Sequence, residues 1–139
     1  RRSLVVESVR RLGAIGPDVM KVPFPEDTTL EDLPRWRDAC AELDEVSPVP
    51  WALLSGGDPY RSFRVQVQIA SESGSSGFLV GRALWGEAVK LTGAERRAAI
   101  EYQVRPRFVE LAQIATTHGT SWYDRVGVGG FATPSFIDY

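Results

Sequence analysis

A lysine inside an apolar segment is the residue whose type and position most directly suggest chemistry. Lys21 lies in DVMKVPFP, and the apolar residues around it are typical of a short buried strand. Burial disfavours a charged amine, so a lysine on a strand covered on both faces would be neutral and nucleophilic. Among 16 lysines and arginines only Lys21 and Lys90 are lysines, and lysine loses its proton far more readily than arginine. We therefore interpret Lys21 as a candidate nucleophile; the alternative is a lysine that extends from the sheet end into water.

Two glycine-bearing turns after apolar segments could bind phosphate. WALLSGGD and GFLVGR each run from a predicted strand into glycine and then into a predicted helix. Backbone N–H groups in such turns are suited to an anion, and an arginine adds a planar cationic fork. The candidate phosphate-binding residues are Ser55, Gly56, Gly57, Gly81 and Arg82. Simpler interpretations stay open, because a Gly-Gly pair is often only a turn and Arg82 could pair with a surface carboxylate.

These residues depend on a scaffold in which strands and helices alternate. Helices are expected at 3–12, from 28 or 29 to 43, at 58–73, around 84–89 and from 94, and strands at 18–22, 51–55 and 77–80. Thr28 or Thr29 is expected to cap the second helix, and Asp58 the third. The segment after Pro59 is ambiguous because its apolar residues alternate, but the flanking caps favour a helix. Pro106 should kink or split the last helix.

The order of these elements predicts an α/β fold. Strands without polar alternation, separated by helices, favour a parallel sheet covered on both faces. Three strands are few for such a fold, and no strand precedes the first helix. We therefore predict the C-terminal part of a (β/α)8 TIM barrel, with its last three strands in residues 1–126 and an irregular tail in residues 127–139. The missing N-terminal half-barrel is expected from the same or another chain.

The composition limits the possible partners and ligands. A net charge of −2 gives no reason to expect nucleic acid or an anionic membrane, and no apolar run approaches the roughly 20 residues of a membrane span. One cysteine excludes an internal disulfide and favours a cytoplasmic protein. With one histidine and one cysteine, no metal site is expected.

A neutral lysine beside a phosphate site favours Schiff-base chemistry. Such sites in a (β/α)8 barrel lie at the carboxyl ends of the strands, and phosphate binds after the last two. The amine would add to the ketone of a ketose phosphate, and the protonated imine would withdraw electrons from the neighbouring carbon–carbon bond. A general acid/base must handle the proton on the oxygen of the departing aldehyde. No residue of this chain clearly takes that role.

Four segments resemble the class I aldolases of the tagatose 1,6-bisphosphate aldolase family, which includes sulfofructosephosphate aldolases. They are DVMKVPFP, PWALLSGGD, SGSSGFLVGRALWGEAV and a later segment with TSW, and their order and spacing agree with the C-terminal half of a family member. The resemblance implies that Lys21 is the Schiff-base lysine and that no cofactor is needed. It places Leu54, Ser55 and Arg82 at substrate- and phosphate-contacting positions, with Gly56, Gly57 and Gly81 beside them. The acid/base glutamate of the family has no counterpart in this chain.

We therefore predict an aldolase that cleaves a ketose 1-phosphate into dihydroxyacetone phosphate and an aldehyde. The expected partners are the phosphorylated ketose and further copies of the protein in a homo-oligomer, with no nucleic acid and no membrane. One alternative is another phosphate-binding barrel enzyme, an isomerase or epimerase, in which Lys21 is only electrostatic. A second alternative is a catalytically silent aldolase homologue that binds sugar phosphates or a protein partner.

Overall fold

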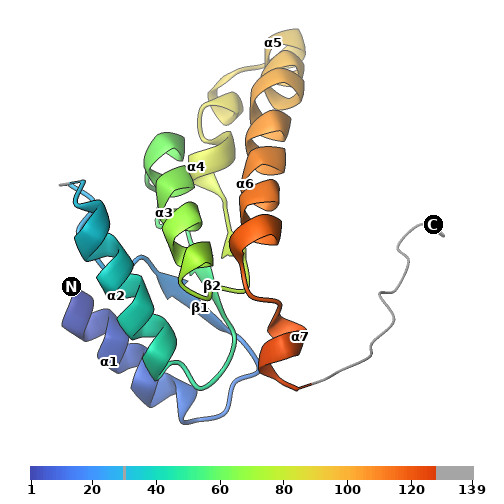
Figure 1. The fold of residues 1–139 in the computed structure, drawn as a ribbon. Coiled ribbons are helices and arrows are strands. Elements are labelled where there is room, and N and C mark those ends of the chain that lie inside the picture. Colours follow the sequence, from blue (N-terminus) through green and yellow to red (C-terminus); the bar gives the residue numbers. More distant parts are fainter. Residues whose placement is uncertain (30, 128–139) are drawn as a thin grey trace.

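Three parallel strands and a layer of helices form the chain, and the computed structural model describes residues 1–29 and 31–127 (Figure 1). In chain order the elements are α1 (Arg2–Gly13), β1 (Met20–Pro23), α2 (Leu33–Val46), β2 (Trp51–Leu54), α3 (Tyr60–Glu72), β3 (Phe78–Leu79), α4 (Arg82–Trp85), η1 (Ala88–Lys90), α5 (Gly93–Ala99), η2 (Ile100–Val104), α6 (Arg105–His118) and α7 (Trp122–Arg125). The alternation of strands and helices that the sequence predicts is therefore present, with strands slightly shorter than expected.

The sheet has the order β1-β2-β3, and both of its strand pairs are parallel. Its register places Lys21 beside Ala52 and Leu54 beside Leu79. Since neighbours in register share a face, the sheet has two chemically different sides. Residues of the helix-facing side are Met20, Val22, Trp51, Leu53 and Phe78, all in the hydrophobic core or packed against it.

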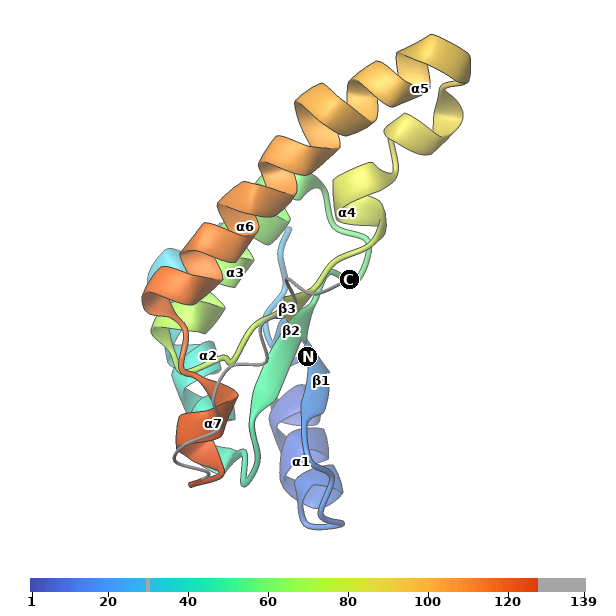
Figure 2. The same cartoon turned by 90° about the vertical axis from the view of Figure 1, so that its right-hand side faces the viewer.

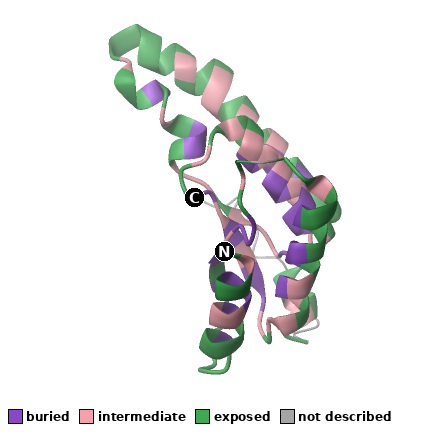
Figure 3. Cartoon of the chain, turned by 90° about the vertical axis from the view of Figure 1, so that its left-hand side faces the viewer, coloured by how far each residue is buried: buried purple, intermediate pink, exposed green. Residues whose placement is uncertain are grey.

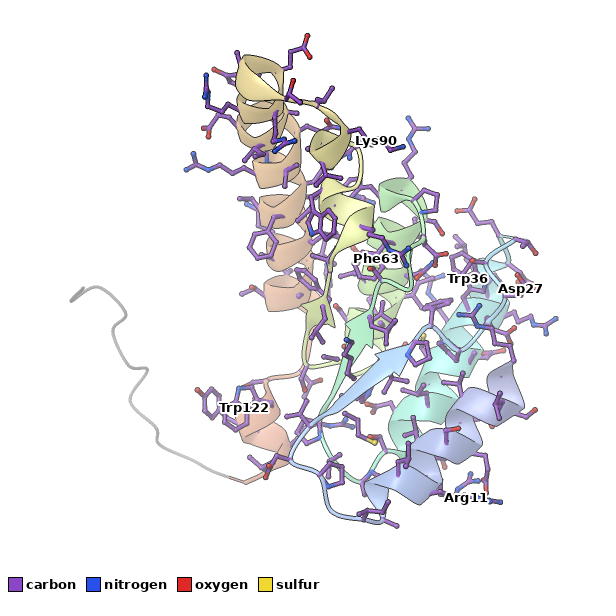
Figure 4. All side chains as sticks on the ribbon, turned by 180° about the vertical axis from the view of Figure 1, so that it is seen from behind. Arg11, Asp27, Trp36, Phe63, Lys90 and Trp122 are labelled. Carbon is purple, nitrogen blue, oxygen red and sulfur yellow. The ribbon has the colours of Figure 1, made fainter. Side chains whose placement is uncertain are left out.

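The helices cover one face of the sheet. Contacts join α1 to α2, α2 to α3 and α3 to α6, so these helices form a continuous layer (Figures 1 and 2). The layer buries Trp36, Cys40, Leu43, Phe63 and Leu111 against the strands. Trp36 and Phe63 point inward from the helices, as Figure 4 shows. Burial raises the pKa of the Cys40 thiol to about 12, which leaves it an unreactive thiol within the core.

The opposite face of the sheet is open. Lys21 and Leu79 are exposed, while Ala52 and Leu54 are only partly buried. The expectation of a sheet covered on both faces is therefore wrong for the described residues, and so is the expected burial of Lys21. The reason is that the helices of this segment lie on one side only (Figures 2 and 3). The barrel itself stays a prediction.

Two expected helix caps differ from the structure. Asp32, rather than Thr28 or Thr29, caps α2 by accepting a hydrogen bond from the Arg35 amide (3.2 Å). Asp58 does not cap α3, which begins after Pro59 without a side-chain cap. Both helix starts have several nearby residues with capping side chains, and residue type alone does not rank them.

Two segments behave as the sequence predicts: the ambiguous segment after Pro59 and the helix that contains Pro106. The segment 60–72 is helical, and its buried residues include Phe63, Val67 and Ala70, which form one stripe. Pro106 interrupts the last helix: five residues of π-helix, Ile100–Val104, separate α5 from α6. The cause is the missing N–H of proline and the clash of its ring with the preceding turn.

The α5 end of this long helix projects beyond the sheet, and α5 has no buried residue (Figure 3). In the described ranges 1–29 and 31–127, no helix combines the length and apolar character that a membrane crossing needs. The irregular tail predicted for residues 127–139 lies outside the described residues, except for Gly127.

Candidate active site

The residues predicted to form the site lie around one hollow at the carboxyl ends of the three strands. Its volume is about 580 Å³. The lining residues are Lys21, Leu54, Ser55, Gly56, Gly57, Leu79, Val80, Gly81, Arg82 and Trp85. All seven predicted site residues are therefore brought together, although the segments that carry them are far apart in the sequence. We call this recess the cationic hollow.

The loop between β2 and α3 lines the cationic hollow with Ser55, Gly56 and Gly57. The Ser55 amide donates to the Leu79 carbonyl (3.1 Å), and the Asp58 amide donates to the Ser55 carbonyl (3.0 Å), which closes a tight turn. Gly56 and Gly57 lie inside this turn with φ of +58° and +100°. These values are strained for other residues, so the Gly-Gly pair is required by the turn. Among the hydrogen bonds of the described residues, none is donated by the amides of these two glycines.

Arg82 lies directly against this turn. A Cβ atom placed on Gly57 would meet Nη2 of Arg82 at 2.8 Å, so the guanidinium rests against the glycine backbone. The absence of a side chain at Gly57 therefore makes room for Arg82. Amides without a hydrogen-bond partner and a guanidinium in the lining of one recess can offer an anion several donors.

The charge of the cationic hollow is unbalanced. Its lining contains the ammonium of Lys21 and the guanidinium of Arg82, but no carboxylate. Within residues 1–29 and 31–127, neither of these cations forms an ion pair, whereas Arg2 and Arg64 each pair with a glutamate. The simpler interpretation of Arg82 as the partner of a surface carboxylate finds no support there. Two unpaired cations in one recess favour an anionic ligand.

Lys21 and Trp85 lie at the rim of the hollow. Lys21 is on the open face of the sheet, and it also lines a second, apolar recess beside α1. The Trp85 ring lies 3.6 Å from the point where a Cβ atom on Gly81 would be, and its side chain is 42% exposed. Trp85 thereby forms part of the lining of the hollow.

A polar cluster joins the start of α3 to α6. The sequence did not indicate this cluster. The Tyr60 hydroxyl donates to Oε2 of Glu110 on α6, and Arg64 donates to the other oxygen of the same carboxylate. Burial, and then the bond to Glu110, raises the pKa of Tyr60; the bonds from Tyr60 and Arg64 lower the pKa of Glu110. Arg107 lies over the Tyr60 ring, 4.8 Å from its centre. These residues are too distant in the sequence for any spacing to reveal the contact.

The arrangement of possible metal ligands is a further feature of the part of the chain that the structure describes. No group of three or more His, Cys, Asp or Glu side chains is arranged there to hold a metal ion. The donors that the cationic hollow offers are cations and amides, which repel a metal ion and attract an anion.

Comparison with known proteins adds a distant relative. No protein-family model matches the chain. The chain is 29% identical over 126 residues to a tagatose 1,6-diphosphate aldolase 1 from Streptococcus mutans serotype c, and the match covers 79% of this chain and 39% of that protein. The chain thus spans about two fifths of the length of the curated relative it matches. The likeness supports a distant relationship of this chain to the tagatose-bisphosphate aldolases.

Proposed function

We propose that this chain supplies the Schiff-base lysine and the phosphate site of a class I aldolase that cleaves a ketose 1-phosphate. The observation that carries the proposal is the pair of cations, Lys21 and Arg82, in one recess whose lining has no carboxylate. The distant likeness to a tagatose-diphosphate aldolase supports the same reaction class. The products would be dihydroxyacetone phosphate and an aldehyde.

Phosphate binding would use the side of the hollow away from Lys21. Arg82 offers a planar fork of N–H donors, and the amides of Gly56 and Gly57 are free to donate beside it. Ser55, which is 8% exposed, and Gly81 complete the turns around this point. Leu54 projects from the open face of the sheet, where it would contact the carbon chain of the substrate.

Lys21 would perform the covalent step. Its neutral amine adds to the ketone carbon, one proton is taken up from an acid and water leaves, which gives a protonated imine. A base takes the proton from the hydroxyl next to the scissile bond; the carbon–carbon bond breaks, its electron pair moves toward the imine nitrogen, and the aldehyde departs. The remaining enamine gains a proton on carbon, and water then releases dihydroxyacetone phosphate and the free lysine. The base belongs to a part of the protein outside these residues.

We also propose that the sheet is a segment of a (β/α)8 barrel whose other strands cover the open face. The strands are parallel, helices lie on one side only, and within the described residues β1 pairs only with β2. Beside β1 lies an apolar recess of about 770 Å³, which we call the apolar groove. A further strand and helix beside β1 would fill the groove and desolvate Lys21, which favours the neutral amine. The expected homo-oligomer stays a prediction.

Borohydride trapping tests the proposed reaction in the intact protein. Incubation with dihydroxyacetone phosphate and sodium borohydride should reduce the imine to a stable secondary amine, which peptide mass spectrometry locates on Lys21. Lys21→Met should show no adduct, while Lys90→Met should react like the unaltered protein, because Lys90 lies near the end of the projecting helices (Figure 4). Phosphate binding without any adduct would contradict the Schiff base and favour the isomerase or the silent homologue.

A further inference from the structure

One buried polar side chain near the turn of Gly56 and Gly57 is only partly satisfied by hydrogen bonds. Gln66 on α3 is 0% exposed. Its Nε2 donates to Oδ2 of Asp58 (2.8 Å) and to Oγ of Ser62 (3.1 Å). Its Oε1 is buried and accepts no hydrogen bond within the described residues. A buried acceptor without a partner lowers stability, and an apolar residue of similar shape would remove that cost.

The hydrogen bond from Gln66 to the Asp58 carboxylate offsets the cost of the unpaired acceptor. Asp58 closes the turn that carries Gly56 and Gly57, since its own amide donates to Ser55. Its carboxylate is the acidic group next to the free amides of the turn, yet Asp58 does not line the cationic hollow. The carboxylate is held back toward α3 by Gln66 instead.

We infer that Gln66 is a positioning residue for the anion site, an inference that rests on the proposed phosphate binding. It keeps the Asp58 carboxylate turned away from the hollow and fixes the turn whose amides face the anion. Without this tether the carboxylate can rotate toward the amides of Gly56 and Gly57. There it competes with phosphate for the same donors and repels it.

The test compares two glutamines of the same helix in the intact protein. Gln66→Met removes the tether and keeps a flexible side chain of similar size; Gln68→Met is the matched control, because the Gln68 side chain donates to Glu72 at the surface. Titration with inorganic phosphate, followed by calorimetry, should show roughly threefold to tenfold weaker binding for Gln66→Met. Gln68→Met should bind like the unaltered protein. The melting temperature of Gln66→Met should be unchanged or higher, because the unpaired acceptor is gone.

A second substitution separates positioning from general damage. In the Gln66→Met background, Asp58→Asn removes the competing charge and should recover most of the lost phosphate affinity. A purely structural role of Gln66 predicts no such recovery. Equal phosphate binding by Gln66→Met and the unaltered protein would overturn this inference and leave the proposed function standing. Failure of the unaltered protein to bind phosphate would overturn the proposed function, and this inference with it.

Discussion

The cationic hollow and the apolar groove share Lys21 in their linings, and they differ in what could fill them. The groove is the larger recess, about 770 Å³ against about 580 Å³, yet Lys21 is the only charged residue of its lining. The hollow carries two cations and free amides. Size therefore does not identify the ligand site here; unsatisfied donors do. Lys21 lines both recesses, so a partner in the groove would also change the surroundings of the Lys21 amine.

The exposed apolar residues of the groove strengthen this contrast. Leu4, Leu12 and Ile15 are 73%, 57% and 79% exposed, and they lie together along α1 and the loop that follows it. Such a contiguous apolar surface is typical of an interface with further protein. The hollow is matched to a small polar ligand, whereas the groove is matched to an apolar protein surface.

The largest effect is expected at the residue that the two recesses share. Lys21→Met should lower aldol cleavage by at least about a thousandfold, because the covalent path is lost with the nucleophile. The fold should persist, since the Lys21 side chain is exposed and contributes nothing to the core. Steady-state kinetics and circular dichroism measure the two outcomes, with Lys90→Met as the control. Retained turnover would exclude the Schiff-base mechanism.

Arg82→Ala tests whether the hollow is an anion site. Loss of a charge-assisted hydrogen bond costs about 1.5–3 kcal/mol, which is tenfold to over a hundredfold in affinity. The ketose phosphate should therefore bind far more weakly, while its dephosphorylated analogue is little affected. Arg97→Ala, on the exposed surface of α5, is the control. Equal losses for both ligands would contradict the placement of the phosphate beside Arg82.

Leu12→Ser tests whether the groove is covered in the intact protein. Leu12 is 57% exposed in this segment, so covering it would bury roughly half of a leucine side chain. The substitution should then lower the free energy of unfolding by about 1–2 kcal/mol. Tyr102→Ser, at a site that is 82% exposed on the projecting helix, serves as the reference surface substitution. Equal, small changes in urea unfolding for both variants would mean that the groove stays open to solvent.

The smallest effects are expected for alanine substitutions at two glycines, one in each recess. Gly16, in the groove, and Gly57, in the hollow, both have positive φ (+85° and +100°), so alanine at either should cost about 1 kcal/mol of stability. A Cβ on Gly16 meets nothing within 4 Å, whereas one on Gly57 meets Arg82 at 2.8 Å. Only Gly57→Ala should also weaken phosphate binding, by roughly threefold to tenfold. Equal phosphate affinities for the two variants would show that Arg82 does not bind the anion from this position.

Much of the fold and the members of the site could be predicted from local patterns. The helical stripe of 60–72, the break before Pro106 and the strands all follow from residue type and spacing. The meeting of Lys21, Ser55 and Arg82 also followed, because parallel strands bring their carboxyl ends to the same edge of a sheet. The glycines of the turn after β2 were recognisable because few other residues tolerate positive φ.

Tertiary structure alone decided how these residues are surrounded. The apolar segment around Lys21 suggested burial on both faces, but a strand pattern cannot state which of its faces another element covers. The Asp58 carboxylate accepts a hydrogen bond from the buried amide of Gln66 and does not cap the start of α3. The contact between Tyr60 and Glu110 depends on the packing of α3 against α6. Local sequence determines which backbone conformations are favourable, whereas the partners of a polar side chain are chosen by segments that only the folded chain brings together.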